Sequence, residues 1–284
     1  MLEPRSGAWV FEPDTVILTG AYKEENMADL RNSNVRAANG AYAGAAIDEG
    51  LRAYMLRVYN LMAMGLGITG VAAYAIAMLA TTNDPASAVA TMGNGKMLTG
   101  LGTALYGSPL KWVVMLAPLG MVFFLSARIE KMSVSAAQTT FWVFAALMGI
   151  SLSSIFLVYT SASITQTFFI TAASFGALSL FGYTTKKDLS AMGSFLMMGL
   201  FGLIIAMVVN IFLQSSALQF AISGIGVLIF AGLTAYDTQQ IKSMYYEGDT
   251  DATAGRKAIM GALRLYLDFI NLFMFLLQFL GNRE

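Results

Sequence analysis

Two acidic residues of this sequence lie where a charge is hardest to accommodate. Of the 17 Asp and Glu residues, 15 fall in segments that can be tails or loops, but Asp237 and Asp268 lie within the apolar stretches GLTAYDTQQIK and ALRLYLDFINLF. A carboxylate inside a membrane-spanning helix costs ~2.5–3.5 kcal/mol or more on insertion scales, so such a residue is a functional candidate by default. These two aspartates are therefore the first candidates for a functional site.

The chemistry open to such a pair is proton sharing. The two stretches predict consecutive antiparallel helices, so the two side chains can lie at similar depth. Two carboxylates a few ångströms apart in low dielectric cannot both ionise freely, and they titrate as a coupled pair. The sequence has no His and no Cys, which excludes the usual proton shuttle, disulfides and thiol chemistry. Simpler roles stay open, because Asp268 can pair with Arg264 at i−4 and Asp237 can be an interfacial residue, solvated or paired with a lysine.

Further polar residues accompany the second aspartate along its predicted helix. They follow a spacing of three to four residues and form one polar stripe, Arg264, Asp268, Asn271 and Gln278. Such a stripe must face protein or water rather than lipid. Asn210, in another apolar run, is explained by an interhelical hydrogen bond.

The elements that hold these residues are membrane-spanning helices. The chain is 57% hydrophobic and 12% charged, against about 25% charged in soluble domains. A hydrocarbon core of ~30 Å needs ~20 helical residues. The charge-free runs 132–185 and 189–236 each fit two helices, with turns at Tyr159–Thr165 and Gln214–Ala217. Further helices over about Arg57–Ala80, Leu110–Ala127 and Ala258–Leu280 bring the total to seven, an all-α bundle. The glycines Gly65, Gly67 and Gly70 lie inside the first span, where close helix packing explains them.

Loop charges predict one orientation. Positive residues gather before helix 1, after helices 2 and 4, and between helices 6 and 7, whereas the opposite loops hold only Lys96. The positive-inside rule places the N-terminus in the cytoplasm. Residues 1–51 contain Pro, Gly, Asn and mixed charges without helical periodicity, so we expect a mobile cytoplasmic tail, followed by a transmembrane domain over residues 52–284.

Four segments give the sequence a family resemblance. AYDTQQIK (235–242), LRLYLDFINLF (263–273), KKDLSAMGSFL (186–196) and NIF (210–212) resemble the Bax inhibitor-1 family, also called transmembrane Bax inhibitor motif proteins. The resemblance covers roughly residues 50–282 and implies a bacterial-type member of the inner membrane, with seven helices and the last at the centre. It also implies a pH-dependent calcium leak gated by a diaspartyl pair, here Asp237 and Asp268. The family's arginine at the cytoplasmic end of helix 2 corresponds to Arg128 in FFLSARIEK.

Calcium is the ion that this resemblance implies, as a transported or weakly bound species. Calcium prefers 6–8 oxygen ligands, and two carboxylates with oxygens of Tyr236, Thr238 and Asn271 would hold it loosely, which suits a leak. We expect no resident cofactor. Because Lys plus Arg and Asp plus Glu both number 17, the global charge points to no nucleic-acid partner. The expected partners are the lipid bilayer, calcium and other membrane proteins.

The sequence argues against two other classes of membrane protein, intramembrane aspartyl proteases and retinal proteins. Intramembrane aspartyl proteases also carry two aspartates on neighbouring helices, but their second motif reads GxGD where this chain has LYLD, and all five prolines precede residue 119. A retinal protein needs a lysine in the last helix, and no Lys follows Lys257. We therefore expect no enzyme. The remaining alternative is a regulatory membrane protein that binds other membrane proteins or a membrane protease, without transport activity of its own.

Overall fold

The computed structural model describes the backbone of residues 15–283 and the side chains of residues 48–283. The chain divides into two compact units, Met1–Gly50 and Leu51–Glu284. Helix α1 runs over Thr15–Ala80, although residues 15–51 have no helical periodicity in the sequence. The physical reason is that no proline occurs between Pro13 and Pro85, and scattered Ala, Glu, Arg and Met sustain a helix without an apolar stripe. The mobility of the tail over residues 1–51 stays a prediction, and residues 1–14 lie outside the described part.

Seven helical segments of the described chain are long and apolar enough to cross a membrane. They are Asp48–Ala80, Leu110–Lys131, Val134–Val158, Ser161–Thr184, Ser190–Leu213, Ser216–Ser243 and Asp251–Leu280. The first lies in α1; the others correspond to α3 (Leu110–Arg128) with the 3₁₀ turn η2 (Ile129–Lys131), α4 (Val134–Leu152) with α5 (Ile155–Val158), α6 (Ser161–Thr184), α7 (Ser190–Leu213), α8 (Ser216–Ser243) and α9 (Asp251–Leu280). The prediction of seven spans in an all-α fold is confirmed.

Serine and threonine caps explain where four of these helices begin. The side chains of Ser133, Thr160, Ser215 and Thr250 each accept a hydrogen bond from the backbone N–H three residues ahead, before α4, α6, α8 and α9. Such caps satisfy N–H groups that have no partner within the helix. They shorten the first predicted turn to residues 159–160, and they start α9 at Asp251 rather than at Ala258.

The connection from α1 to α3 is a small folded unit. Its strands β1 (Thr81–Thr82), β2 (Ala90–Thr91) and β3 (Met97–Leu98) form an antiparallel sheet in the order β1-β3-β2, followed by α2 (Gly100–Gly102) and the π-helix η1 (Thr103–Gly107). Lys96 Nζ donates to the carbonyl of Phe156 at 2.6 Å, and Asn94 Nδ2 donates to that of Leu157 at 2.8 Å. These bonds occupy carbonyls in the short helix α5 and hold the connection against it.

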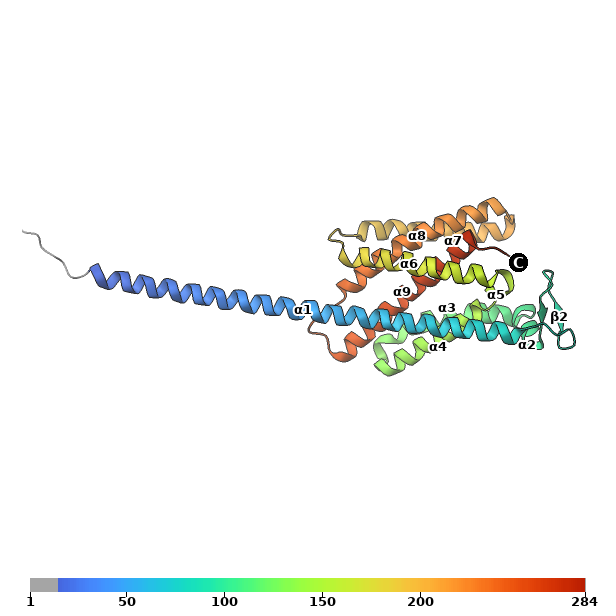
Figure 1. Ribbon diagram of the computed structural model, residues 1–284, viewed down its shortest axis with the longest axis horizontal. Coiled ribbons are helices and arrows are strands. Elements are labelled where there is room, and N and C mark those ends of the chain that lie inside the picture. Colours follow the sequence, from blue (N-terminus) through green and yellow to red (C-terminus); the bar gives the residue numbers. More distant parts are fainter. Residues whose placement is uncertain (1–14, 284) are drawn as a thin grey trace, which may run out of the picture. The chain divides into compact units, whose positions relative to one another are not determined.

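The last helix lies at the centre of the bundle, as expected. Of its most apolar window, 72% is buried, against at most 39% in any other span and 6% in α7. It packs on α8, α6 and α4, and Figure 1 shows it crossing behind the helices that surround it. Because lipid surrounds the outer helices, the central position of α9 gives its polar stripe protein partners.

Glycines allow the closest helix contacts. A Cβ on Gly182 of α6 would overlap the backbone of Ala235 in α8, and a Cβ on Gly65 would lie 2.9 Å from the Phe141 ring. Gly67 and Gly70, in contrast, have open space where a Cβ would be. Close packing therefore explains Gly65 but not the other two glycines of the predicted cluster.

Candidate functional site

The structure brings Asp237 and Asp268 together. Asp237 lies on α8 and is half-buried, Asp268 lies on α9 and is 5% exposed, and the two carboxyl groups are within hydrogen-bonding reach of each other. The two helices pack closely where Gly261 of α9 meets Ile241 of α8. A Cβ added to Gly261 would lie only 3.0 Å from Ile241 Cγ2. The two aspartates thus form one site between adjacent antiparallel helices.

The environment of this pair suits a shared proton. Within the described residues, Asp268 Oδ2 has no N–H or hydroxyl partner. An ionised carboxylate that is buried without a donor is strongly destabilised, and two carboxyls in contact relieve this by holding one proton between them. The pair can therefore change its charge without any histidine.

Arg264 is the cation that acts on both carboxyls, and it lies one helical turn before Asp268 on α9. Its charge serves the pair and not Asp268 alone, which extends the intrahelical pairing considered from the sequence. Arg128, the residue matched to the family's latch, is the last residue of α3 and its side chain is exposed. Within residues 48–283 no ion pair or hydrogen bond joins Arg128 to either aspartate, although Ile129 and Glu130, which follow it, lie near the α8–α9 loop.

A cavity of about 470 Å³, with both charged and apolar lining residues, lies at the end of the bundle nearest the α8–α9 loop. It is lined by Ile129, Glu130, Met244, Thr253, Arg256, Lys257, Met260 and Arg264. The exposed Arg264 side chain faces this cavity and also acts on the carboxyl pair. Arg264 therefore links this cavity electrostatically to the pair, and neither aspartate lines the cavity itself.

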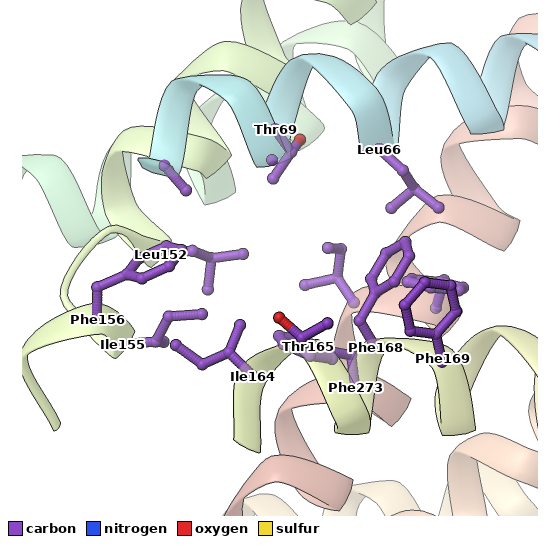
Figure 2. A pocket seen from close by; sticks show the side chains of 14 residues that line it. Leu66, Thr69, Leu152, Ile155, Phe156, Ile164, Thr165, Phe168, Phe169 and Phe273 are labelled. Atoms are coloured by element: carbon purple, nitrogen blue, oxygen red, sulfur yellow. The ribbon is translucent and has the colours of Figure 1, made fainter. Parts of the chain in front are cut away.

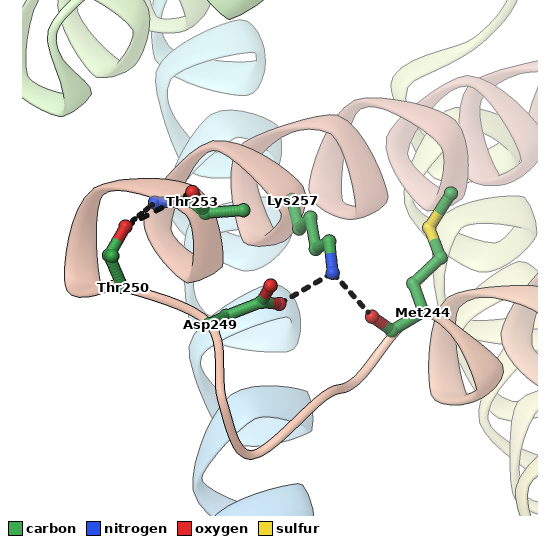
Figure 3. Close-up of polar contacts among 5 residues, drawn as sticks. All are labelled: Met244, Asp249, Thr250, Thr253 and Lys257. Carbon is green, nitrogen blue, oxygen red and sulfur yellow. Dashed lines mark hydrogen bonds and ion pairs between the residues drawn. The ribbon is translucent and has the colours of Figure 1, made fainter.

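The loop beside this cavity is held by one lysine. Lys257 Nζ donates to Asp249 Oδ2 at 2.5 Å and to the carbonyl of Met244 at 3.0 Å, as drawn in Figure 3. The Thr250 cap follows directly, where Thr253 N–H donates to the Thr250 hydroxyl. The end of α8 is thereby tied to the first turns of α9.

Three of the predicted supporting residues serve other contacts. The Tyr236 ring packs on Gly193 of α7, where an added Cβ would lie 2.5 Å from it. Asn271 Nδ2 donates to the carbonyl of Leu267 in its own helix. The Thr238 hydroxyl donates to the carbonyl of Thr234 and is bonded to a chain of hydroxyls, Ser179 Oγ at 2.9 Å and then Tyr59 Oη 2.6 Å farther on. These oxygens are not gathered around the carboxyl pair.

The KKDL and AYDTQQIK segments meet at the α6–α7 loop. Gln239 of α8 donates to the carbonyl of Lys187 and accepts from the N–H of Leu189, both at 2.8 Å. Beside them, Asp188 lies outside the spans, and its hydrogen bonds from the side chain and backbone of Ser190 hold the pKa of that carboxyl below its ordinary value. These hydrogen bonds tie the loop before α7 to α8 and give Gln239 of the second segment a structural role.

At the opposite end of α9 the polar stripe makes amide contacts. Gln278 Oε1 accepts from Gln219 Nε2 at 2.8 Å, and Gln219 Oε1 accepts from Asn210 Nδ2 at 3.1 Å. The interhelical hydrogen bond predicted for Asn210 is confirmed. This network joins α7, α8 and α9 but lies ten residues beyond Asp268, so it belongs to the structure of the bundle.

Two tyrosines near the site were missed by sequence reasoning. The Tyr266 hydroxyl lies 2.6 Å from Thr69 Oγ1, which in turn donates to the carbonyl of Ala145 at 2.8 Å. Tyr54 has a buried hydroxyl without a hydrogen-bond partner in the described region, and the charges of Arg264 and Asp249 act on it. A tyrosine in an apolar run gives no signal of its own, because it can equally face the membrane interface.

The residues around the pair offer few ligands for a metal ion. Within the described part of the chain, no group of three or more acidic, His or Cys side chains could hold one. Two carboxyls fall well short of the 6–8 oxygens that calcium prefers. An ion at this point would keep most of its water, as a passing ion does.

Comparisons with known proteins agree with this architecture. The family described as "Inhibitor of apoptosis-promoting Bax1" matches residues 51–284. An uncharacterised protein of Rickettsia prowazekii is 50% identical over 84% of this chain and 92% of its own length. An uncharacterised protein of Caulobacter vibrioides is 46% identical over 91% and 100%. The inner membrane protein YbhL of Escherichia coli is 45% identical over 83% and 94%. This chain is an integral membrane protein that belongs to the Bax inhibitor-1 family.

Proposed function

We propose that this protein is a pH-sensitive leak channel for calcium or related cations in the bacterial inner membrane, gated by Asp237 and Asp268. The observation that carries the proposal is the contact between two carboxyl groups, one of them 5% exposed, at the interface of α8 and α9. A buried acid pair in a membrane bundle is costly and is retained for a function. On this proposal the protein is not an enzyme and needs no resident cofactor.

The gating step follows from electrostatics. When both carboxyls are ionised, their repulsion weakens the packing of α8 on α9 and their charge attracts cations. When they share a proton or are both protonated, a short hydrogen bond joins the helices and the attraction falls. Arg264 moderates the repulsion. The titratable groups near that arginine are Tyr54 and the charged residues of the same cavity, Glu130, Arg256 and Lys257, of which Lys257 is paired with Asp249. The leak therefore decreases as pH falls through the titration of the pair.

The cavity at the Arg264 side supports the same proposal. It lies beside the α8–α9 loop, which we expect to be cytoplasmic, and one of its lining residues, Arg264, acts on the carboxyl pair. On the other side of the pair, the Tyr266–Thr69 hydrogen bond and the rings of Phe141 and Phe144, 5.9 and 5.2 Å from Tyr266, close the core. A cation can pass only when α9 and its neighbours separate there.

Calcium flux into proteoliposomes across pH 6–8 tests the proposal. Wild type should show flux above empty vesicles that falls with pH, and Asp237→Asn and Asp268→Asn should flatten the profile because an amide does not titrate. Asp188→Asn is the matched control, since it removes an exposed acid outside the spans and should retain the wild-type profile. If wild type shows no flux, or all four proteins share one profile, the channel proposal fails and the regulatory alternative takes its place.

A further inference from the structure

A second cavity lies between four helices on the side of the bundle away from the α8–α9 loop. It has a volume of about 350 Å³, within the range of small-molecule sites. Its lining comes from α1, the α4–α5 break, α6 and α9: Leu66, Thr69, Gly70, Ala73, Leu152, Ile155, Phe156, Ile164, Thr165, Phe168, Phe169, Phe269, Ile270 and Phe273. Figure 2 shows the side chains of α1 and α6 facing each other across it.

The cavity has a buried wall and an open rim. Phe269 and Ile270 of α9 are 3% and 8% exposed, whereas Phe168 and Phe169 of α6 are 42% and 66% exposed. Across from them, Gly70 of α1 is exposed and leaves open space where a Cβ would be. The rim therefore opens sideways between α1 and α6, within their membrane-spanning parts, and the medium at the opening is lipid.

The lining chemistry selects a hydrocarbon occupant. It contains no charged residue and only two hydroxyls. The Thr69 hydroxyl is already bonded to Tyr266 and to the carbonyls of Gly65 and Ala145, and Thr165 lies exposed at the rim. A cation or a lipid headgroup would lose its hydration shell here, and the lining offers too few polar groups to replace the lost water. An acyl chain has no hydration shell to lose.

A polar cavity adjoins the apolar one. It has a volume of about 430 Å³ and shares Phe156 with the apolar cavity, while its other lining includes Asn83, Asn94, Lys96 and Ser161. Ser161 is the first residue of α6 and Ile164–Phe169 follow it, so the apolar cavity lies one to two helical turns deeper in the membrane. The rings of Tyr74 and Phe156, 6.1 Å apart, stand between the two.

We propose that this pair of cavities binds one membrane phospholipid. One acyl chain enters sideways between α1 and α6 and fills the apolar cavity, and the phosphate end lies in the polar cavity near Lys96. The order of the two cavities along the membrane normal matches the order of tail and headgroup in a lipid leaflet. The inference rests on this geometry and is independent of whether the carboxyl pair gates a leak.

Photo-cross-linking of the full chain in proteoliposomes tests this site. The probe is phosphatidylglycerol that carries a diazirine midway along one acyl chain, and labelled peptides are mapped by mass spectrometry. Wild type should be labelled most strongly within residues 66–73 and 164–169. Gly70→Leu places a side chain in the cavity lining at a position where an added Cβ meets no atom within 4 Å, so it narrows the cavity and should abolish this labelling. Gly67→Leu adds the same side chain to the same helix at a glycine outside the cavity and should leave it intact.

A second variant and a second probe complete the test. Thr165→Phe narrows the cavity from α6 at an exposed position, so it should also abolish the labelling even if Gly70→Leu does not fold. The proposal is overturned if labelling is spread evenly over exposed apolar residues such as Phe201 and Phe212 of α7, or if both cavity variants label like wild type. It is equally overturned if a diazirine fatty acid labels the two segments and the phospholipid does not.

Discussion

Among the residues whose side chains the structure describes, Arg264 is the cation whose charge acts on both carboxyls of the site. This gives a prediction about the pH profile. Without this cation the pair should keep its shared proton to higher pH, because the second ionisation is less favourable. Arg264→Gln should therefore move the midpoint of the calcium leak to higher pH. Flux measurements across pH 6–8 in proteoliposomes give that midpoint.

Arg256→Gln is the control for this change. It removes the same charge from the same cavity, but Arg256 donates to the carbonyl of Met132 and does not act on the aspartates within the described structure. It should alter the size of the leak through the local cation concentration and leave the midpoint unchanged. Equal midpoints for both variants and wild type would show that Arg264 does not tune the pair.

The sequence predicted the positions of some candidate site residues but not of others. Asp237 and Asp268 could be predicted as a pair, because charge inside apolar runs is conspicuous and consecutive helices are antiparallel. Tyr236 and Thr238 flank Asp237 in sequence. Consecutive residues of a helix are rotated by about 100° around its axis, so these two side chains contact α7 and α6 instead. Arg128 was correctly placed at the end of its helix by the family pattern, but the sequence could not show that its side chain is exposed and makes no hydrogen bond or ion pair with either aspartate in the described structure.

At the scale of elements, glycines at helix contacts control how closely α6 and α8 pack. Gly182→Ala would overlap the backbone of Ala235, and backbone cannot move aside as a side chain does. We expect a loss of about 1–3 kcal/mol or more in the free energy of unfolding. Gly176→Ala in the same helix meets no atom within 4 Å and should be neutral or stabilise by up to about 1 kcal/mol. Unfolding in detergent compares the two, and equal stabilities would contradict the contact.

Helix existence was easier to predict than helix ends. Long runs without charge had to span the membrane, so the seven spans followed from length alone. The ends depend on caps such as Thr160 and Thr250, whose side-chain bonds are local choices among several possible serines and threonines. The 3₁₀ turn after α3 and the break between α4 and α5 have no distinct pattern in the sequence.

At the scale of the whole molecule, the distribution of positive charge predicts the orientation. Reporter fusions at residues 40, 187 and 250 should be cytoplasmic, and fusions at 90 and 162 external. Because the chain has no native Cys, a single introduced cysteine is a unique label. A cysteine at residue 90 should react with an impermeant reagent added outside, whereas one at 187 should react only after the membrane is opened. Labelling of residue 187 from outside would show that the protein has the opposite orientation in the membrane.

The central position of α9 has a consequence for how the protein is made. Of the seven spans in the described chain, α9 is the last to be synthesised, yet it is the most buried and packs on α4, α6 and α8. Six inserted helices must therefore leave a vacant slot until synthesis reaches residue 251, and a chain interrupted earlier has no core around which to assemble. Late entry also delivers Asp268 to Asp237 in one step, so neither lipid nor translocon holds the finished acid pair before the bundle closes. Quality-control proteases that recognise unassembled spans would sense the arrival of this one helix.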